Sequence, residues 1–534
     1  MFKAKRTLIA VLACLCVATS AFSACGDSSA NASSNSSESS FENSSTETSS
    51  NNEDEISSDE AASNEENSKP NEDSSDEGQS SEEDFSQISL GLHLTLSEDG
   101  NSYAVKGVGT NTDKKVVIPA EYNSLPVTAI LDGAFWDKKY IENVYIPDTV
   151  KSIGYEAFWN CHALTRVSIP DSVQEIKDRA FHSCVDLKTV KLGAGVQSIG
   201  ETAFGNCLTL QSIQCSENNP HFSSLDGTLY NKNQSKLLRY ATGRKDTQIT
   251  LPDSVTEIGN FAFHQTNTLK TVIFGNSLVS IGQYAFAESS ALETAPCFPQ
   301  SLRYIGSSAF SKCSNLSGEL QLPTGLESIG AYAFNECKRL SGTLTIPASV
   351  TSIGEAAFYQ CRNFTALDLQ ANVTELKDFT FYQCYNMHGT LTLPASLTKI
   401  GSKTFGWCYG FNDLQLNDGL QEISESAFYY CYSLEKELVI PDSVKKIYDS
   451  AFAFCRKLPS IIIGSGVNFI GMEAFHECRV LKTATFMDAS GWVHAPQSDF
   501  DGATAVPEAE LQNTTKAATY LTKNYEKHYW KKQF

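Results

Sequence analysis

The chain has 534 residues and a formal net charge of −21, although only 19% of its residues are charged. Residues 26–84 contribute −17 and the amino-terminal end contributes +3, so residues 85–534 carry only −7. Because such a chain offers no broad basic face for phosphates, we expect no nucleic-acid partner. No apolar run of about 18 residues occurs beyond the start of the chain, so the sequence predicts no internal membrane span.

Residues 1–24 have the pattern of a bacterial signal peptide. Three basic residues precede an apolar run, 8–18, that is too short to span a membrane comfortably. The sequence Phe-Ser-Ala-Cys-Gly follows, and it resembles a bacterial lipoprotein box with Phe22 in the place of the usual Leu. The resemblance implies cleavage before Cys25, acylation of its thiol and anchoring at the outer face of the bacterial cell membrane. The alternative is an ordinary secretory signal with an incidental cysteine.

Residues 25–88 are predicted to be a disordered acidic linker. Residues 26–84 hold 18 Asp or Glu residues, many Ser residues and one aromatic residue, Phe41. Such a segment buries too little apolar surface to offset the entropy that it would lose on ordering. We expect the linker to hold a folded head away from a surface; the composition leaves open whether it also carries glycans or crosses a cell wall.

A repeat dominates residues 125–487. A Phe, usually preceded by Ala, recurs 14 times at intervals of 23 or 24 residues, with one interval of 59 that holds an insertion of 36 residues. Five residues before the Phe stands Ile or Leu, followed in nine copies by Gly, and three residues after it stands Cys in 11 copies. The repeat phenylalanines are Phe135, Phe158, Phe181, Phe204, Phe263, Phe286, Phe310, Phe334, Phe358, Phe381, Phe405, Phe428, Phe452 and Phe475.

The whole unit reads Ile-Gly-x-x-Ala-Phe-x-x-Cys-x-x-Leu-x-x-Val-x-Ile-Pro. It resembles the BspA-like (Treponema pallidum-type) leucine-rich repeat family. The resemblance implies an α/β leucine-rich-repeat solenoid: a right-handed superhelix of short parallel strands, one per repeat, joined by tight turns and short helical pieces. One copy is too small to hold a core, so stability must come from stacking successive copies.

The strand segment of the unit supports this interpretation independently. In one copy, strand alternation places Val167 and Ile169 inward while Arg166 and Ser168 point outward. Pro170 then ends the strand because proline has no N–H for the ladder. We further expect the Gly of each Ile-Gly pair to occupy a position with positive φ.

Both ends of a solenoid need covering. Residues 89–124 hold apolar alternations around a Glu-Asp-Gly turn, which predicts an amino-terminal hairpin cap. Residues 488–534 lose the repeat, and Leu521, Tyr525 and Tyr529 recur at four-residue spacing, which predicts a carboxy-terminal cap with a short amphipathic helix. The lysines of this helix are expected to face solvent or, alternatively, anionic lipid.

The insertion, about residues 214–247, is expected to form a hairpin. Asp226-Gly227 lies between apolar alternations, which is a strong hairpin signal. The hairpin either decorates one turn of the solenoid or protrudes as a recognition element.

One cysteine per unit predicts a column of buried thiols, since free Cys behaves as a small hydrophobe. Disulfides between neighbouring copies are the alternative, because an exported chain allows them and the spacing does not exclude them. We expect no metal site, because the sequence has no paired Cys-x-x-Cys and no cluster of His ligands. The column consists of Cys161, Cys184, Cys207, Cys313, Cys337, Cys361, Cys384, Cys408, Cys431, Cys455 and Cys478.

The motifs of common catalytic sites are missing from the sequence. It contains no Gly-rich phosphate loop, no His-Glu-x-x-His and no Gly-x-Ser-x-Gly. A Cys that occurs in 11 equivalent copies has no reason to be a nucleophile in one of them. The sequence therefore predicts a protein that is not an enzyme and that needs no cofactor.

The outward strand positions are the candidate binding site, a concave face rich in Thr, Ser and Gln. This composition fits either strand residues that simply face water or a long polar surface for weak, multi-point binding. The candidate residues are Tyr145, Arg166, Thr189, Lys191, Glu319, Gln321, Thr343, Thr345, Asp368, Thr390, Thr392, Asp413, Gln415 and Glu437.

Two functions fit an anchor, a spacer and a long repeat surface. The first is a surface-anchored, adhesin-like recognition protein, a monomer that binds an extracellular protein or glycan of a host or neighbouring cell and touches the membrane only through its lipid. The resemblance favours this function, because some relatives bind extracellular matrix proteins. The alternative is a structural component of the cell envelope that binds wall polymer.

Overall fold

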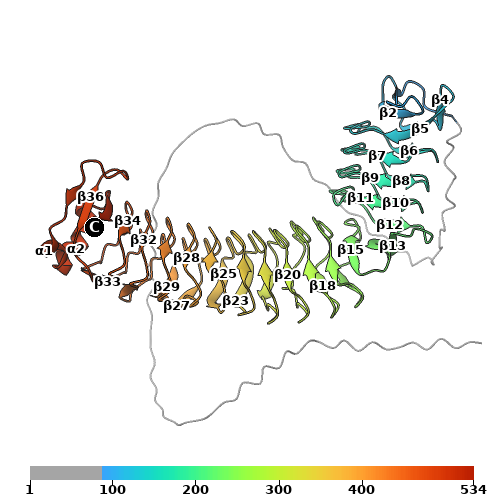
Figure 1. Ribbon diagram of the computed structural model, residues 1–534. Helices are drawn as coiled ribbons and strands as arrows, with labels where there is room; N and C mark the ends of the chain where they lie inside the picture. Colours follow the sequence, from blue (N-terminus) through green and yellow to red (C-terminus); the bar gives the residue numbers. More distant parts are fainter. Residues whose placement is uncertain (1–86, 534) are drawn as a thin grey trace, which may run out of the picture. The chain divides into compact units, whose positions relative to one another are not determined.

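The computed structural model describes residues 87–533, and the expected signal peptide, Cys25 and linker residues 25–86 lie outside the described residues. The described chain is a solenoid of parallel β-strands with little helix (Figure 1). Each repeat forms one turn of the solenoid, called a rung below. The solenoid expected from the repeat is therefore confirmed, but most rungs contribute two strands rather than one.

The longer strand of a rung comes from the Leu-x-x-Val-x-Ile segment, and neighbouring rungs pair in parallel with like positions opposite each other. Val167 lies opposite Val190, and Ile169 lies opposite Leu192. The long strands are β3 (Lys115–Val117), β6 (Asn143–Tyr145), β8 (Arg166–Ile169), β10 (Thr189–Leu192), β12 (Ser212–Cys215), β16 (Gln248–Thr250), β18 (Thr271–Ile273), β21 (Ser317–Glu319), β23 (Arg339–Ile346), β25 (Asn363–Leu369), β27 (His388–Thr392), β29 (Gly410–Gln415), β31 (Leu438–Ile440), β33 (Ser460–Ile463) and β35 (Thr483–Phe486).

In most rungs the second strand is a residue pair that ends at the Ile or Leu five positions before the repeat Phe, whereas β5 and β15 are longer. Two residues are too few to show an alternation of apolar and polar positions, so the sequence did not reveal this strand. The strands of this second column are β5 (Leu125–Ile130), β7 (Ser152–Ile153), β9 (Glu175–Ile176), β11 (Ser198–Ile199), β15 (Lys236–Arg239), β17 (Glu257–Ile258), β19 (Ser280–Ile281), β20 (Tyr304–Ile305), β22 (Ser328–Ile329), β24 (Ser352–Ile353), β26 (Glu375–Leu376), β28 (Lys399–Ile400), β30 (Glu422–Ile423), β32 (Lys446–Ile447) and β34 (Phe469–Ile470).

The repeat phenylalanines form a stacked column inside the solenoid. Phe135 and Phe158 have ring centroids 4.8 Å apart and planes 7° apart, and Phe158 repeats this contact with Phe181 at 5.0 Å. None of the 14 rings is more than 3% exposed. The column therefore supplies an apolar anchor in each of these rungs and joins neighbouring rungs through a shared core on each side of the insertion.

The Ala-Phe segment is a turn where the resemblance implied a short helical piece, and the helices of the described residues lie only within 508–524. In the rung of Phe158, the residues two positions before and after the Phe, Glu156 and Asn160, have φ values of 54° and 62°. Every second N–H group of this turn points along the stack to the next rung. Phe158 N donates to Ala180 O at 2.7 Å, and Asn160 N donates to His182 O at 2.9 Å. The turns thus form a third hydrogen-bonded ladder between rungs.

The glycines of the Ile-Gly pairs do not have positive φ, so that prediction was wrong. Their role is to let successive rungs approach each other. A Cβ on Gly154 would lie 2.5 Å from Asp132 N, and a Cβ on Gly354 would lie 2.2 Å from Ala331 N. Positive φ is instead carried mainly by non-glycine residues two positions on either side of the repeat Phe.

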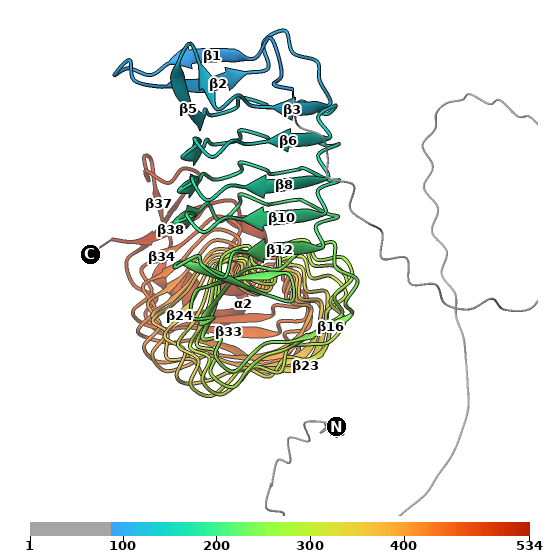
Figure 2. The same cartoon turned by 90° about the vertical axis from the view of Figure 1, so that its right-hand side faces the viewer.

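The insertion interrupts the solenoid. The antiparallel strands β13 (Phe222–Leu225) and β14 (Thr228–Asn231) are joined at Asp226-Gly227, and β14 continues into β15, which resumes parallel pairing with β17. The long-strand sheet ends at β12, and β16 begins a separate one. Buried apolar residues form two clusters that meet here, and the run of rungs changes direction (Figures 1 and 2).

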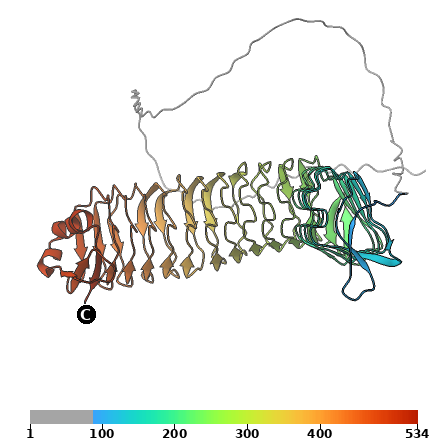
Figure 3. The ribbon, with the colours of Figure 1, turned by 90° about the horizontal axis from the view of Figure 1, so that it is seen from above.

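Irregular elements cover the two ends of the described chain. At the amino-terminal end, β1 (His93–Leu96) and β2 (Tyr103–Gly107) form an antiparallel hairpin, and β4 (Glu121–Tyr122) pairs with β5. At the other end lie three short helices and a small antiparallel sheet (Figure 3). These elements are β36 (Trp492–Ala495), β37 (Thr504–Ala505), α1 (Glu508–Leu511), α2 (Thr514–Thr519), the π-helix η1 (Tyr520–Asn524) and β38 (Tyr529–Lys532).

The prediction of an amphipathic helix that includes Tyr529 was wrong at the carboxy-terminal end of that helix. The helical part stops at Asn524, and Tyr529 begins β38, which pairs antiparallel with β34 and β36. Trp530 of this strand is 1% exposed and packs at the end of the core. Lys532 is buried as well and forms an ion pair with Asp488, so it is not part of a solvated or lipid-facing lysine row.

Candidate recognition surfaces

The sequence-predicted residues lie on or directly beside the long strands and form what we call the long-strand face. In β23, Thr343 and Thr345 point outward while Leu344 and Ile346 are buried in the core. The face is divided at the insertion. Tyr145, Arg166, Thr189 and Lys191 belong to the sheet of β3 to β12, and the other ten residues belong to the sheets that follow.

Within the long-strand face, like positions of neighbouring rungs stand opposite each other. Thr390 Oγ1 donates to Asp413 Oδ2 at 3.4 Å, and Thr392 Oγ1 donates to Gln415 Oε1 at 3.2 Å. These side chains therefore satisfy one another's hydrogen-bonding groups between neighbouring rungs. The only aromatic member among the predicted residues is Tyr145, which is 42% exposed. The face consists of polar rows without a cluster of aromatic anchors.

A second surface, which the sequence interpretation missed, follows the turns of the later rungs. We call it the aromatic edge. Its residues occupy positions two before and one, two and four after the repeat Phe, and most are half-buried. They are Phe379, Tyr382, Tyr385, Trp407, Tyr409, Tyr429, Tyr430, Tyr432 and Phe454. The sequence carries a signal for this surface, because consecutive copies have aromatic residues at the same turn positions.

Two stacked rows form the aromatic edge. In the first, Tyr430 stacks between Trp407 and Phe454, with ring centroids 4.6 and 4.3 Å away. In the second, Tyr409 stacks between Tyr385 and Tyr432 at 5.2 and 5.1 Å. Stacking along the solenoid covers the ring faces, so the rows present ring edges and hydroxyl groups.

Arginines lie over both ends of the tyrosine row. The guanidinium of Arg362 is 5.3 Å from the centroid of Tyr385, and that of Arg456 is 5.3 Å from the centroid of Tyr432. Such cation–π contacts hold a guanidinium against a ring face. Burial raises the pKa of Tyr409 to about 12, so its hydroxyl is protonated at neutral pH. The edge thus combines fixed aromatic rings, hydroxyl donors and two guanidinium groups, of which that of Arg456 also lies 3.6 Å from a carboxylate oxygen of Glu477.

The cysteine column lies inside the rungs and belongs to the core. Each column thiol is at most 2% exposed and donates to the main-chain oxygen of the Phe in the preceding rung, as Cys161 Sγ does to Phe135 O at 3.1 Å. Burial raises the pKa of Cys161 to about 12, which disfavours a nucleophilic thiolate. No disulfide joins the 13 cysteines in the part of the chain described, and no group of potential metal ligands gathers there.

The sequence also matches a family. Four segments, residues 127–234, 240–341, 318–391 and 388–491, match the family described as BspA type leucine rich repeat region. These segments cover more than half of the chain, which therefore belongs to this family. Proteins of the family are generally found at the cell surface or secreted, and the solenoid is typically a binding scaffold rather than an enzyme.

Several solved structures are similar in fold. A leucine-rich repeat protein from Bacteroides ovatus is 24% identical, with 75% of this chain and 94% of that chain covered and a TM-score of 0.47. The pneumococcal vaccine antigen PcpA is 17% identical, with 68% and 92% covered and a TM-score of 0.36. The leucine-rich repeat protein of T. pallidum is 19% identical, with 60% and 87% covered and a TM-score of 0.20. No curated protein matches the chain.

Among the helices of residues 87–533, none has the length and apolar character that crossing a bilayer requires.

Proposed function

We propose that this protein is a surface recognition protein, adhesin-like, that binds an extracellular protein of a host or neighbouring cell through the aromatic edge. The observation that carries the proposal is the pair of stacked rows with an arginine at each end of the tyrosine row. Tyr, Trp and Arg are the residues that dominate the energy of protein–protein interfaces. Rings already held by stacking lose little conformational entropy on binding, so the aromatic edge is preorganised for a protein ligand.

The aromatic edge supports a protein ligand better than a sugar polymer. A platform for sugars needs open ring faces, whereas the faces of Tyr409 and Tyr430 are covered on both sides by neighbouring rings. Ring edges, hydroxyl groups and guanidinium groups instead suit the peptide groups and carboxylates of a protein surface. A structural role through binding of wall polymer is therefore the less favoured function.

Anchoring completes the proposal. Acylation of Cys25 would fix the chain to the outer face of the cell membrane, and the acidic linker would hold the solenoid away from it. The long-strand face would then add weak polar contacts beside the edge, as its Thr, Gln and Asp rows allow.

The proposal is tested by binding of the compact unit 81–534 to immobilised extracellular matrix proteins and to isolated wall polymer. We expect saturable binding to a protein, and the double variant Tyr409→Ser/Tyr432→Ser should weaken it at least about tenfold. The matched control, Thr390→Ala/Thr392→Ala on the long-strand face, should change the affinity by less than about threefold. Unchanged melting temperatures exclude unfolding as the cause.

Two results would overturn the proposal. Binding to wall polymer alone would favour the structural role. A protein ligand that binds the tyrosine double variant as tightly as the unchanged chain would remove the aromatic edge from the interface. In that case a triple charge reversal at Glu319, Asp368 and Asp413 would show whether the long-strand face binds instead.

A further inference from the structure

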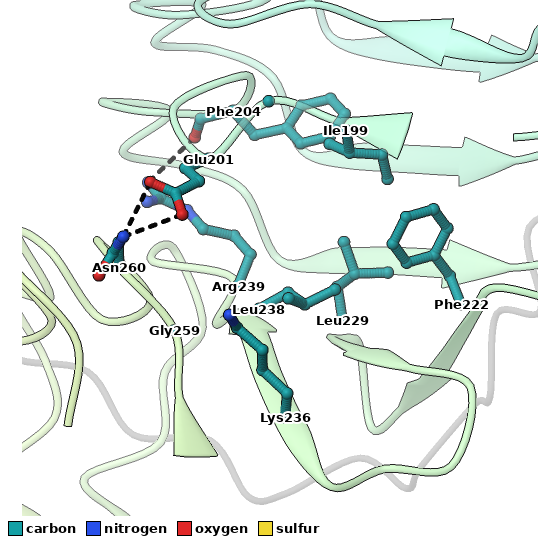
Figure 4. Close-up of a pocket in the computed structure, with 11 residues that line it drawn as sticks. Ile199, Glu201, Phe204, Phe222, Leu229, Lys236, Leu238, Arg239, Gly259 and Asn260 are labelled. Atoms are coloured by element: carbon teal, nitrogen blue, oxygen red, sulfur yellow. Dashed lines mark hydrogen bonds between the residues drawn. The ribbon is translucent and has the colours of Figure 1, made fainter. Parts of the chain in front are cut away.

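A cavity of about 180 Å³ lies where the insertion interrupts the solenoid, and we call it the junction cavity (Figure 4). Phe222, Leu229 and Leu238 of the inserted strands form apolar walls, and Ile199 and Phe204 close it from the preceding rung. A cavity of about 150 Å³ is large enough to hold a benzene molecule. The junction cavity therefore has room for a small organic ligand.

Arg239 lines this cavity and is 4% exposed. Its guanidinium donates to the main-chain oxygen of Phe261 at 2.7 Å and to that of Phe204 at 3.0 Å, the second of which is drawn in Figure 4. It forms no ion pair with any carboxylate of the described residues, and its Nε has no hydrogen-bond partner. A buried cation without an anionic partner is costly, so this arrangement calls for a compensating charge.

The titratable groups nearest Arg239 do not supply that charge. Burial lowers the pKa of His182 and of His264 to about 4, so both imidazoles are neutral at pH 7. Burial raises the pKa of Cys207 to about 12, so this thiol keeps its proton. The pKa of Arg239 is itself lowered to about 10 by burial, and the guanidinium still carries its charge at neutral pH.

A purely structural role explains the hydrogen bonds of Arg239 but not its charge. In regular rungs the Phe carbonyl is satisfied by a neutral group, as Phe181 O is by Cys207 at 3.2 Å and Phe263 O is by Ser289 at 2.7 Å. At the insertion, the guanidinium of Arg239 donates the corresponding hydrogen bond to Phe204 O. A hydroxyl or amide could donate there without bringing a buried positive charge to the cavity wall.

The other charged side chains that line the cavity are Glu201, which accepts hydrogen bonds from a neutral amide, and Lys236, which already has a carboxylate partner. Asn260 Nδ2 donates to both oxygens of Glu201, at 2.9 and 3.0 Å, and Lys236 Nζ lies 2.7 Å from Glu257 Oε1. Arg239 is thus the group that remains for an anion. We infer that the junction cavity binds a small organic carboxylate whose apolar body packs against Phe222, Leu229 and Leu238 while its carboxylate pairs with the Arg239 guanidinium.

The experiment compares phenylacetate with its neutral analogue phenylacetamide on the compact unit 81–534, by ligand-observed NMR titration. We expect phenylacetate to bind at least about tenfold more tightly than the amide, because only the acid compensates the buried charge. The variant Arg239→Met keeps the apolar shape of the side chain and should lose at least about tenfold in phenylacetate affinity. The matched control Lys270→Met removes an exposed, ion-paired lysine that does not line the cavity, and it should bind within about twofold of the unchanged chain.

If Arg239→Met does not fold, Leu238→Trp tests the site in its place, because the larger ring fills the cavity and leaves Arg239 unchanged; phenylacetate binding should then be lost. Equal affinities for acid and amide, or no binding of either up to about 10 mM, would overturn the proposal. Displacement of phenylacetate by an equal concentration of chloride would also overturn it, since the cavity would then hold an inorganic anion rather than a carboxylate. These measurements do not depend on the proposed protein ligand.

Discussion

The thiol of Cys361 donates a hydrogen bond of 3.1 Å to the main-chain oxygen of Phe334, one rung earlier. The same oxygen also accepts from Cys337 N within its own rung. The same thiol contact recurs along the whole cysteine column, and at one position a serine makes it, where Ser289 Oγ donates to Phe263 O. The column is therefore better described as a row of buried donors than as a row of small hydrophobic residues.

Replacement of Cys361 tests this description. Cys361→Ala removes the donor and leaves a small void, and we expect it to lower the free energy of unfolding by about 1–2 kcal/mol. Cys361→Ser keeps a donor, as Ser289 does naturally, and should cost less than the alanine variant. Urea midpoints of the two variants provide the measurement. If the alanine variant were as stable as the serine variant, the hydrogen bond would contribute nothing.

Thiol labelling provides a second prediction. The 11 column thiols are buried, whereas Cys297 is exposed and Cys215 is half-buried. An alkylating reagent added to the folded protein should label Cys297 first and leave the column unlabelled, because burial raises the pKa of thiols such as Cys313 to about 12. Unfolding without reductant should then expose the column to labelling, as intact-mass measurement would show. A Cys297→Ser variant should lose the fast label, and a column that stays unlabelled after unfolding would indicate disulfides.

The sequence sufficed for the main features of the fold because they repeat. Fourteen aligned phenylalanines identify the core column, and alternation in Arg166–Ile169 identifies the long strand. The short strands were missed because a pair such as Ser152–Ile153 has no room for alternation. The glycine prediction failed because local conformational preference was considered without the distance between neighbouring rungs, which sets the requirement at Gly354.

The candidate surfaces were less predictable. The residues of the long-strand face could be placed outward from alternation alone, but Tyr409 and Tyr430 become neighbours of other rings only when turns stack. Arg239 lies in the insertion, where no repeat alignment gives its position, and its burial depends on the distant carbonyls of Phe204 and Phe261. The hairpin at Asp226-Gly227 was accessible from its local sequence signal, whereas contacts between segments far apart in the chain, such as those of Arg239, were not.

Close approach between rungs leads to a third prediction. In Gly354→Ala the new Cβ would lie 2.2 Å from Ala331 N. Because a main-chain atom can move little, we expect the free energy of unfolding to fall by about 3 kcal/mol. Gly389 is the matched control: its φ is +88°, but a Cβ there meets nothing within 4 Å. Gly389→Ala should therefore cost only about 1 kcal/mol, from backbone strain. Urea midpoints test the order, and equal losses would mean that rung spacing adjusts freely.

The last prediction concerns pH. His182 and His264 are largely buried beside Arg239, and burial lowers both pKa values from 6.5 to about 4. The unfolded chain therefore binds more protons than the folded chain between these values, so stability is complete above about pH 6.5 and falls as the pH drops toward 4. We expect the free energy of unfolding to fall by up to about 2 kcal/mol per histidine over this pH range. This is less than the full pKa difference would give, because both rings keep some contact with solvent.

Urea midpoints measured from pH 7.5 to pH 3 test this dependence. His182→Gln should flatten the decline, since the amide cannot take up the proton that the unfolded chain gains. His388→Gln is the control, because His388 is exposed in β27 and far along the chain from the insertion. A profile for His182→Gln that matches the unchanged chain would show that protonation at the insertion does not limit acid stability. A decline that begins only below pH 4 would instead assign acid unfolding to the carboxylates, such as Asp488, whose pKa is lowered to about 2 chiefly by its contact with Lys532.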